Sequence, residues 1–113
     1  MIDWSKTKYE ITIREEHLPV EGNAMASGED AYDRACEAAI LLRLDRDDLW
    51  AWCMVTVTAS HPDLPFDGDG VALGACSYKD EEDFKAGGYY EDMKAEALEN
   101  LQEKVKMVLD AAS

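Results

Sequence analysis

The chain has 113 residues, 47% of them hydrophobic, and its 25 acidic and 11 basic side chains give a formal net charge of −14. Disorder requires low hydrophobicity together with high net charge, so this composition excludes an acidic disordered tail and predicts one folded domain over residues 1–113. The charge also argues against bare nucleic acid and anionic membranes as partners, because phosphates would be repelled.

The N-terminal region predicts a strand followed by a helix. Apolar and polar side chains alternate over residues 9–13, which is the period of a half-buried strand. After a loop at 21–24, Ser27 is a candidate N-cap for a helix that we expect to end near Leu44. The apolar stripe of this helix consists of Ala31, Ala35, Ala38 and Leu42. Such small side chains predict close packing on a flat surface, such as a sheet.

Residues 50–60 predict the clearest strand, with two different faces. The odd-numbered positions carry Ala, Cys and Val and should meet the helices. A third strand is expected over 71–78, antiparallel to the second, and Gly74 in it marks a bulge or the close approach of another backbone. The segment 67–70 is expected to be a turn, because an EF-hand loop would need Glu where this chain has Tyr78.

The C-terminal region predicts a short helical turn from residue 80 and a long helix from about residue 90 to 111. The long helix has apolar side chains at three- and four-residue spacing. These are Tyr90, Met93, Ala97, Leu98, Leu101, Val105, Val108 and Leu109. The order β-α-β-β-α predicts an α+β fold, a three-stranded antiparallel sheet with two main helices packed on one face.

The negative charge is concentrated in the middle of the chain. Residues 15–48 and 49–92 each carry a net charge of −7, whereas residues 93–113 carry −1. These acids are candidate contacts for Arg and Lys side chains of a basic partner. For residues 80–83 the alternative is a solvated acidic helix N-terminus, which the helix dipole favours. The candidate contacts are Glu29, Asp30, Asp33, Glu37, Asp80, Glu81, Glu82 and Asp83.

A second candidate surface lies on the even-numbered face of residues 50–60. If this face is the open side of the sheet, Trp50, Trp52 and Met54 form an exposed apolar patch. Such patches mark interfaces, so a homodimer or a different partner through this face is one hypothesis. The alternatives are that loops 15–27 or 61–70 cover the indoles, or that the strand is flipped.

Residue types with catalytic or metal chemistry form no recognisable motif. Cys36, Cys53 and Cys76 lack a CxxC spacing and are expected to be buried thiols in a reducing compartment. His17 and His61 lack metal-ligand spacing. We therefore expect no enzyme activity, no cofactor and no metal.

Two further expectations concern location and small ligands. No apolar run approaches the ~20 residues of a membrane span and no signal peptide precedes the first strand, so a cytoplasmic location is expected. A nucleotide binder or sponge is an alternative function. It would require Arg14, Arg34 or Arg43 to cluster in a pocket.

Several short motifs resemble a group of small phage and prophage proteins. They are Gly22-Asn23-Ala24, Trp50-Ala51-Trp52-Cys53 with Val55 and Val57, Leu73-Gly74-Ala75-Cys76-Ser77-Tyr78, Asp83-Phe84, Gly88-Tyr89-Tyr90, Asp92-Met93 and Ala97-Leu98. The resemblance covers roughly residues 10–101 and implies no site residue. It implies a genomic setting in which small acidic proteins bind and disable host enzymes, including defence nucleases.

The leading hypothesis is a non-enzymatic phage-type protein in the cytoplasm of the host cell. It would bind and inhibit a basic, nucleic-acid-binding host protein, as an anti-CRISPR or other anti-defence inhibitor does. DNA mimicry is one route, because duplex DNA carries one charge per ~1.7 Å and fourteen charges match about 24 Å of duplex. The alternatives are a homo-oligomeric interaction module that uses the Trp50/Trp52 face, and the nucleotide binder.

Overall fold

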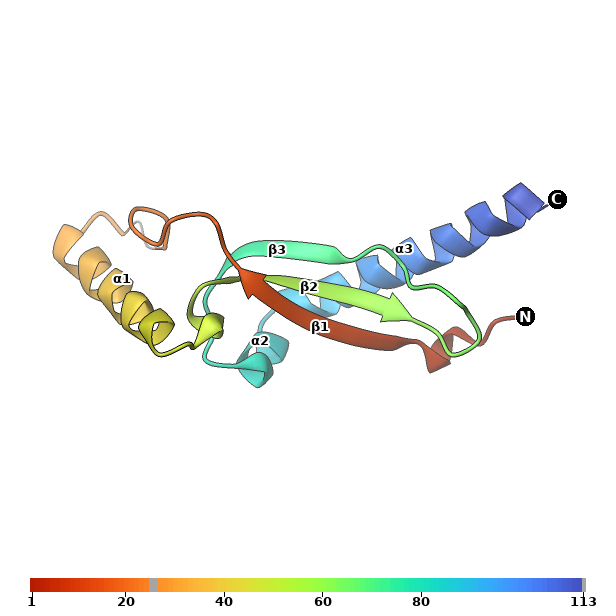
Figure 1. The fold of residues 1–113 in the computed structure, drawn as a ribbon, viewed down its shortest axis with the longest axis horizontal. Coiled ribbons are helices and arrows are strands. Elements are labelled where there is room, and N and C mark those ends of the chain that lie inside the picture. The colour runs from red at the N-terminus through yellow and green to blue at the C-terminus, as the bar shows by residue number, and fades with distance from the viewer. Residues whose placement is uncertain (25–26, 113) are drawn as a thin grey trace. The chain divides into compact units, whose positions relative to one another are not determined.

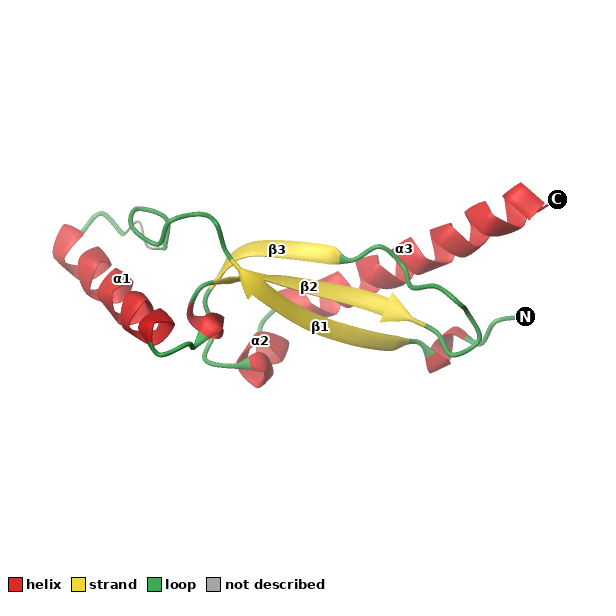
Figure 2. Cartoon of the chain, viewed as in Figure 1, coloured by secondary structure: helices red, strands yellow, loops and turns green. Residues whose placement is uncertain are grey.

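A computed structural model describes residues 1–24 and 27–112. Three strands, β1 (Lys8–Glu15), β2 (Cys53–Ser60) and β3 (Val71–Cys76), form one antiparallel sheet in the order β1-β2-β3 (Figure 1). The helices are α1 (Asp30–Asp45), α2 (Glu81–Ala86) and α3 (Tyr89–Ala112), with short 3₁₀ turns η1 (Trp4–Lys6) and η2 (Leu49–Ala51). The predicted α+β class and its three-stranded antiparallel sheet are confirmed (Figure 2).

The chain divides into two compact units, which are described separately. Unit 1 contains residues 1–12, 56–72 and 85–113, and unit 2 contains residues 13–55 and 73–84. The charge is unevenly shared between them, since unit 2 carries −9 and unit 1 carries −5.

Strand β2 supplies much of the core. Its side chains alternate between buried and half-buried along the whole strand, and Cys53, Val55, Val57 and Ala59 have no exposed area. Full burial of a Val side chain stabilises a fold by about 1.5–3 kcal/mol. The odd-numbered positions therefore face the core, but the prediction that they meet the helices does not hold for α1, none of whose residues is buried. The strand begins three residues later than predicted, because η2 occupies Leu49–Ala51.

In unit 1, helix α3 packs through the first half of its predicted stripe. Met93, Ala97 and Leu101 are buried, whereas Val108 and Leu109 are 48% and 64% exposed. The predicted stripe is therefore buried in the N-terminal half of α3, whereas Val108 and Leu109 near its C-terminal end are exposed.

The segment 67–70 lies in the loop that connects β2 to β3, and it contains no turn of its own. Instead it lies along α3, where Lys104 Nζ donates to the Asp67 carbonyl at 2.9 Å and Asn100 Nδ2 donates to the Asp69 carbonyl at 3.0 Å. A Cβ atom on Gly68 would lie 2.7 Å from the Leu101 backbone nitrogen. Glycine at this position therefore allows the segment to approach the helix backbone.

In unit 2, helix α1 departs from the prediction. All sixteen of its residues are described and none is buried, so the prediction that this helix packs on the sheet is wrong. Ser27 is not the N-cap, because its hydroxyl donates to the Asp33 carboxylate at 2.6 Å and Glu29 occupies the N-cap position. The predicted end at Leu44 is one residue early.

The thiols are only partly as expected. All three cysteines are free, and Cys53 and Cys76 are buried, but Cys36 is half-buried. Burial raises the pKa of Cys53 to about 12 and also raises the pKa of Cys76. The two buried thiols are therefore protonated, inert core residues at neutral pH.

Candidate functional site

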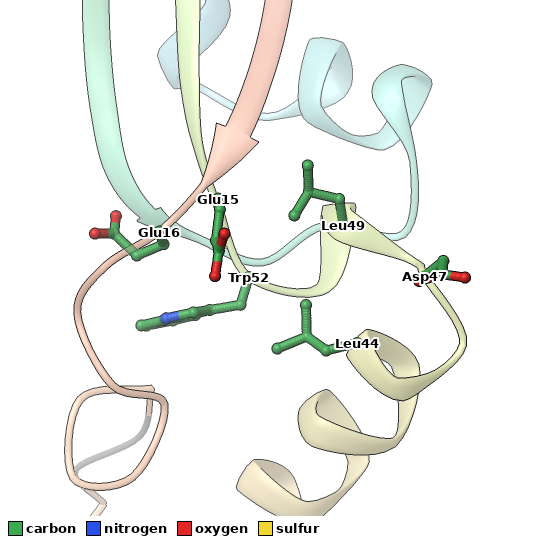
Figure 3. Close-up of a pocket in the computed structure, with 6 residues that line it drawn as sticks. All are labelled: Glu15, Glu16, Leu44, Asp47, Leu49 and Trp52. Carbon is green, nitrogen blue, oxygen red and sulfur yellow. The ribbon is translucent and has the colours of Figure 1, made fainter.

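A pocket of about 520 Å³ opens in unit 2, where residues from the end of β1, the end of α1 and the region around η2 meet (Figure 3). Three acidic and three apolar residues line it. They are Glu15, Glu16, Asp47, Leu44, Leu49 and Trp52. In Figure 3, Glu15, Leu44 and Leu49 project toward one space beside the Trp52 ring, and Asp47 lies at the rim. The pocket combines carboxylates with an apolar floor.

Glu16 is fixed in place by backbone donors. Its carboxylate accepts hydrogen bonds from the Ala75 N–H at 2.6 Å and from the Leu18 N–H at 3.1 Å. The bond from Ala75 contributes most to holding the pKa of Glu16 below its usual value, and the bond from Leu18 comes second. Glu16 therefore stays negatively charged in the pocket. A Cβ on Gly74 would lie 2.9 Å from Glu16 Oε2. The close approach predicted at Gly74 is therefore made by a carboxylate and not by another backbone.

Trp52 forms the apolar floor and is not on an open sheet face. Trp52 precedes the first residue of β2 and is 4% exposed. Its indole N–H donates to the Leu18 carbonyl at 2.7 Å. The prediction of an exposed Trp50, Trp52 and Met54 patch is wrong for this residue. The alternative, in which a loop within 15–27 covers the indole, describes what is found.

The other two residues of that patch are also partly covered. Trp50 packs against Tyr78 and Phe84, with ring centroids 6.5 Å and 5.9 Å away. Met54 is half-buried, and its sulfur lies 3.3 Å from an Arg14 guanidinium nitrogen. No exposed aromatic patch exists at these described residues, and the oligomer hypothesis loses this face.

Asp47 adopts an unusual backbone conformation. The Asp48 N–H bonds the Arg43 carbonyl and the Asp47 N–H bonds the Leu44 carbonyl, both at 3.0 Å. This pair of bonds is a Schellman motif, and it places the residue after the helix C-cap in the left-handed region, where glycine is favoured. Asp47 has a φ of 61°. Its carboxylate also stands at the negative end of the α1 dipole.

None of the eight predicted contact acids lines this pocket. Asp33 accepts hydrogen bonds from the Ser27 N–H and hydroxyl, and Glu37 accepts one from the Gly22 N–H at 3.1 Å. With Asp30, these two acids surround a shallow hollow of about 320 Å³ beside Arg34. Asp33 and Glu37 therefore have intramolecular roles.

The acidic run at 80–83 caps helix α2. The Asp80 carboxylate accepts a hydrogen bond from the Asp83 N–H, and the Asp83 carboxylate accepts one from the Lys79 N–H, both at 2.9 Å. This reciprocal arrangement satisfies backbone donors at a helix start, as a capping box does. For Asp80 and Asp83 it fits the solvated helix terminus alternative. Glu29, Asp30, Glu81 and Glu82 are exposed.

Sequence reasoning missed Glu15, Glu16 and Asp47 as functional candidates. Glu15 and Glu16 follow a strand in sequence and look like ordinary surface acids. One signal was available for Asp47, since acids at the end of a helix are disfavoured by the dipole.

The described residues offer little to a metal or a nucleotide. No group of three or more His, Cys, Asp or Glu among them could hold a metal ion. Arg43 donates to Asp48 at 2.7 Å and to the Tyr78 carbonyl at 2.6 Å. Arg34 donates to the Asp30 carbonyl, and Arg14 lies at Met54. These arginines have separate partners, so the cluster that a nucleotide binder requires is not formed.

The last observations concern membrane helices and similarity to known proteins. None of the helices in the described part of the chain has the length and apolarity that a membrane crossing needs. Comparison of the chain with protein families, curated proteins and solved structures gives no match. The resemblance to phage proteins stays a prediction, and the function has to be argued from the pocket.

Proposed function

We propose that the protein binds a basic protein, and that an Arg or Lys side chain of this partner enters the acidic pocket of unit 2. The observation that carries the proposal is the pocket in which Glu15 points toward the apolar ring of Trp52, with Glu16 and Asp47 also in its lining. Long basic side chains have an apolar stem and a charged head. The stem fits the floor and the head meets the carboxylates, which form strong charge-assisted hydrogen bonds.

The strained residue at the rim supports this reading. Asp47 combines a left-handed backbone with a negative charge at a helix C-terminus, and both features cost stability. Backbone strain of this kind is concentrated at functional sites. A third carboxylate at the rim favours the capture of a cation.

The charge distribution supports a basic partner more generally. Unit 2, which contains the pocket, carries −9 of the total −14. A field of this sign steers positively charged surfaces toward the pocket and accelerates association, more so at low salt.

The biological role that follows is inhibition. Arg and Lys side chains that bind phosphate are also the groups that fit these carboxylates. A partner with such side chains engaged cannot use them for nucleic acid. This is the action proposed here for an anti-defence inhibitor, of which an anti-CRISPR protein is one kind.

Binding of a fluorescein-labelled nona-arginine peptide, followed by anisotropy, tests the pocket. The double variant Glu15→Gln/Asp47→Asn removes two pocket charges, and Asn tolerates the left-handed backbone. We expect affinity to fall by about tenfold or more, which is about 1.4 kcal/mol. Raising NaCl from about 50 to 300 mM should also weaken binding of the parent protein.

The matched control is Glu96→Gln/Glu99→Gln, which removes two exposed charges from α3 in unit 1. It should change affinity by less than about twofold, because it keeps the three pocket carboxylates and salt screens the general field of the molecule. Equal losses in both double variants would show that only net charge matters, and would remove the pocket from the proposal.

A further inference from the structure

A second pocket, of about 610 Å³, opens in unit 1 and shares no lining residue with the acidic pocket of unit 2. The segment before β1, the loop after β2 and the C-terminal half of α3 each contribute a wall, and all the lining side chains are apolar. They include Ile2, Trp4, Leu64, Phe66, Val105 and Leu109. Pockets of this size and character bind small, largely apolar molecules.

One buried imidazole connects two of these walls. Nδ1 of His61 accepts a hydrogen bond from the Asp63 N–H at 3.0 Å, so Nε2 carries the hydrogen and donates to the Asp3 carbonyl at 2.8 Å. The Trp4 ring meets the same imidazole edge to face, with the ring centroids 5.7 Å apart. The segment before β1 and the loop after β2 are therefore positioned without a ligand, which lowers the cost of ordering them on binding.

A half-buried ammonium group lies beside this pocket. Nζ of Lys104 is 5.4 Å from the centroid of the Phe66 ring, which lines the pocket. An ammonium has three N–H donors, and Lys104 makes one hydrogen bond, to the Asp67 carbonyl. It forms no ion pair with any described residue, whereas Lys94 of the same helix pairs with Glu91 at 3.1 Å. Lys104 therefore has donors for an anionic group at the edge of an apolar pocket.

We propose that this pocket binds the acyl chain of a free fatty acid, with the carboxylate on Lys104. Burial of the chain supplies the affinity, and a charge-assisted hydrogen bond selects the anionic head group. The net charge of −14 repels anions in general, so a preference for an anionic amphiphile requires a local cation. The inference concerns unit 1 and does not depend on the function proposed for the pocket of unit 2.

Titration calorimetry with decanoate, decanol and decyltrimethylammonium, each below its micelle concentration, tests the site. Decanoate should bind at one site per chain and more tightly than the other two. It should also bind about tenfold more tightly than octanoate, because two more methylene groups are buried. If decyltrimethylammonium binds as tightly as decanoate or more tightly, the net charge and not Lys104 selects the ligand, and the inference is overturned.

Two variants locate the head group. Lys104→Gln should weaken decanoate binding by about tenfold, the contribution of one hydrogen bond to a charged group, and should leave decanol binding unchanged. The matched control Lys106→Gln removes the same charge from an exposed position of α3 and should change decanoate affinity by less than about twofold. Equal losses in the two variants would overturn the role of Lys104.

A third variant locates the acyl chain and remains informative if Lys104→Gln disturbs the fold. Val108 lines the pocket and is 48% exposed, so Val108→Gln should fold with unchanged circular dichroism. By placing a polar group in the wall it should weaken decanoate and decanol binding alike, by about threefold or more. Unchanged binding would place the chain elsewhere and overturn the inference.

Two other occupants of the pocket are outcomes of the same set of measurements. Sedimentation equilibrium should give the chain mass of 12.6 kDa, and a dimer that Val108→Gln dissociates would mean that a second copy fills the pocket. Vesicles of phosphatidylcholine and phosphatidylglycerol should not retain the protein, because its net charge is repelled by anionic lipid. Retention that Val108→Gln abolishes would mean that the pocket faces a membrane. Either result would overturn the fatty-acid site.

Discussion

At the residue scale, Asp47 places a carboxylate where local stability disfavours it. The Schellman bonds at the end of α1 impose a left-handed backbone on this position. Glycine would adopt that conformation without penalty and would remove a negative charge from the helix C-terminus. Stability and cation binding therefore make opposite demands on one residue.

Replacing Asp47 by glycine should stabilise the protein and weaken binding. The gain expected in the free energy of unfolding is about 1–2 kcal/mol, from relief of the left-handed conformation and of the unfavourable dipole contact. Urea unfolding measures it, and nona-arginine anisotropy measures the loss of affinity. Asp47→Asn separates the two causes, because it removes the charge and keeps a side chain. A loss of stability in Asp47→Gly would contradict the argument.

The Glu16 carboxylate makes stability depend on pH in a defined direction. Its folded pKa is lowered by the Ala75 and Leu18 N–H groups. The stabilisation is therefore complete above the unfolded value of about 4.3 and is lost as pH falls through the lower folded value. The melting temperature of the parent should exceed that of Glu16→Gln at pH 7, and the difference should shrink below about pH 4. A difference that is the same at pH 3 and pH 7 would mean that the charged carboxylate has no such role.

The role of Glu16 could not be predicted from the sequence. Its strongest partner, Ala75, is 59 residues away along the chain. Periodicity and composition describe neighbours within one element, and they contain no information on which loop a side chain reaches. The pocket as a whole is assembled from such distant pairs.

At the element scale, a helix or strand could be predicted where the pattern of neighbouring residues alone determines its structure. The alternation in β2 could be predicted because every second side chain enters the core. The same alternation continues through Trp50, Ala51 and Trp52, yet η2 forms at Leu49–Ala51. Contacts of Trp50 with Phe84 and of Trp52 with the Leu18 carbonyl accompany the turn, and these contacts are not local in sequence.

Close packing of the 67–70 segment on α3 gives an element-scale prediction. In Gly68→Ala the new methyl group would meet the Leu101 backbone at 2.7 Å and would have to push the segment and the helix apart. Overpacking of this kind costs about 1–3 kcal/mol in the free energy of unfolding. Urea unfolding provides the measurement.

The comparison variant for this prediction is Gly88→Ala, where a Cβ would have no neighbouring atom of the described residues within 4 Å. Its stability should change less than that of Gly68→Ala. Equal changes would show that contact with α3 does not set the cost.

At the scale of the whole molecule, the charge pattern has a different meaning in space than along the chain. Along the chain, residues 15–48 and 49–92 each carry −7, which places the acidity in the middle of the sequence. The folded units are discontinuous, and the charge divides as −9 and −5 between them. The pocket acids lie in the more negative unit, although the acidic runs that stand out in sequence cap helices and hold loops.

A net charge of −14 also predicts how salt affects the fold itself. Self-repulsion of like charges destabilises a compact state, and a Debye length of about 10 Å at 0.1 M salt removes most of it. Exposed ion pairs such as Lys94–Glu91 oppose this trend only weakly. We therefore expect the melting temperature to rise as NaCl increases from about 10 to 200 mM.

This measurement belongs at low protein concentration, so that any association between copies does not contribute to it. Glu21→Lys in unit 2 reduces the net negative charge from −14 to −12 at an exposed position. This variant should melt at a higher temperature than its parent in low salt, and the two should converge in high salt as the charges are screened. A gain that persists undiminished in high salt would have to come from a local contact of the new lysine, and repulsion across the molecule would then not limit stability.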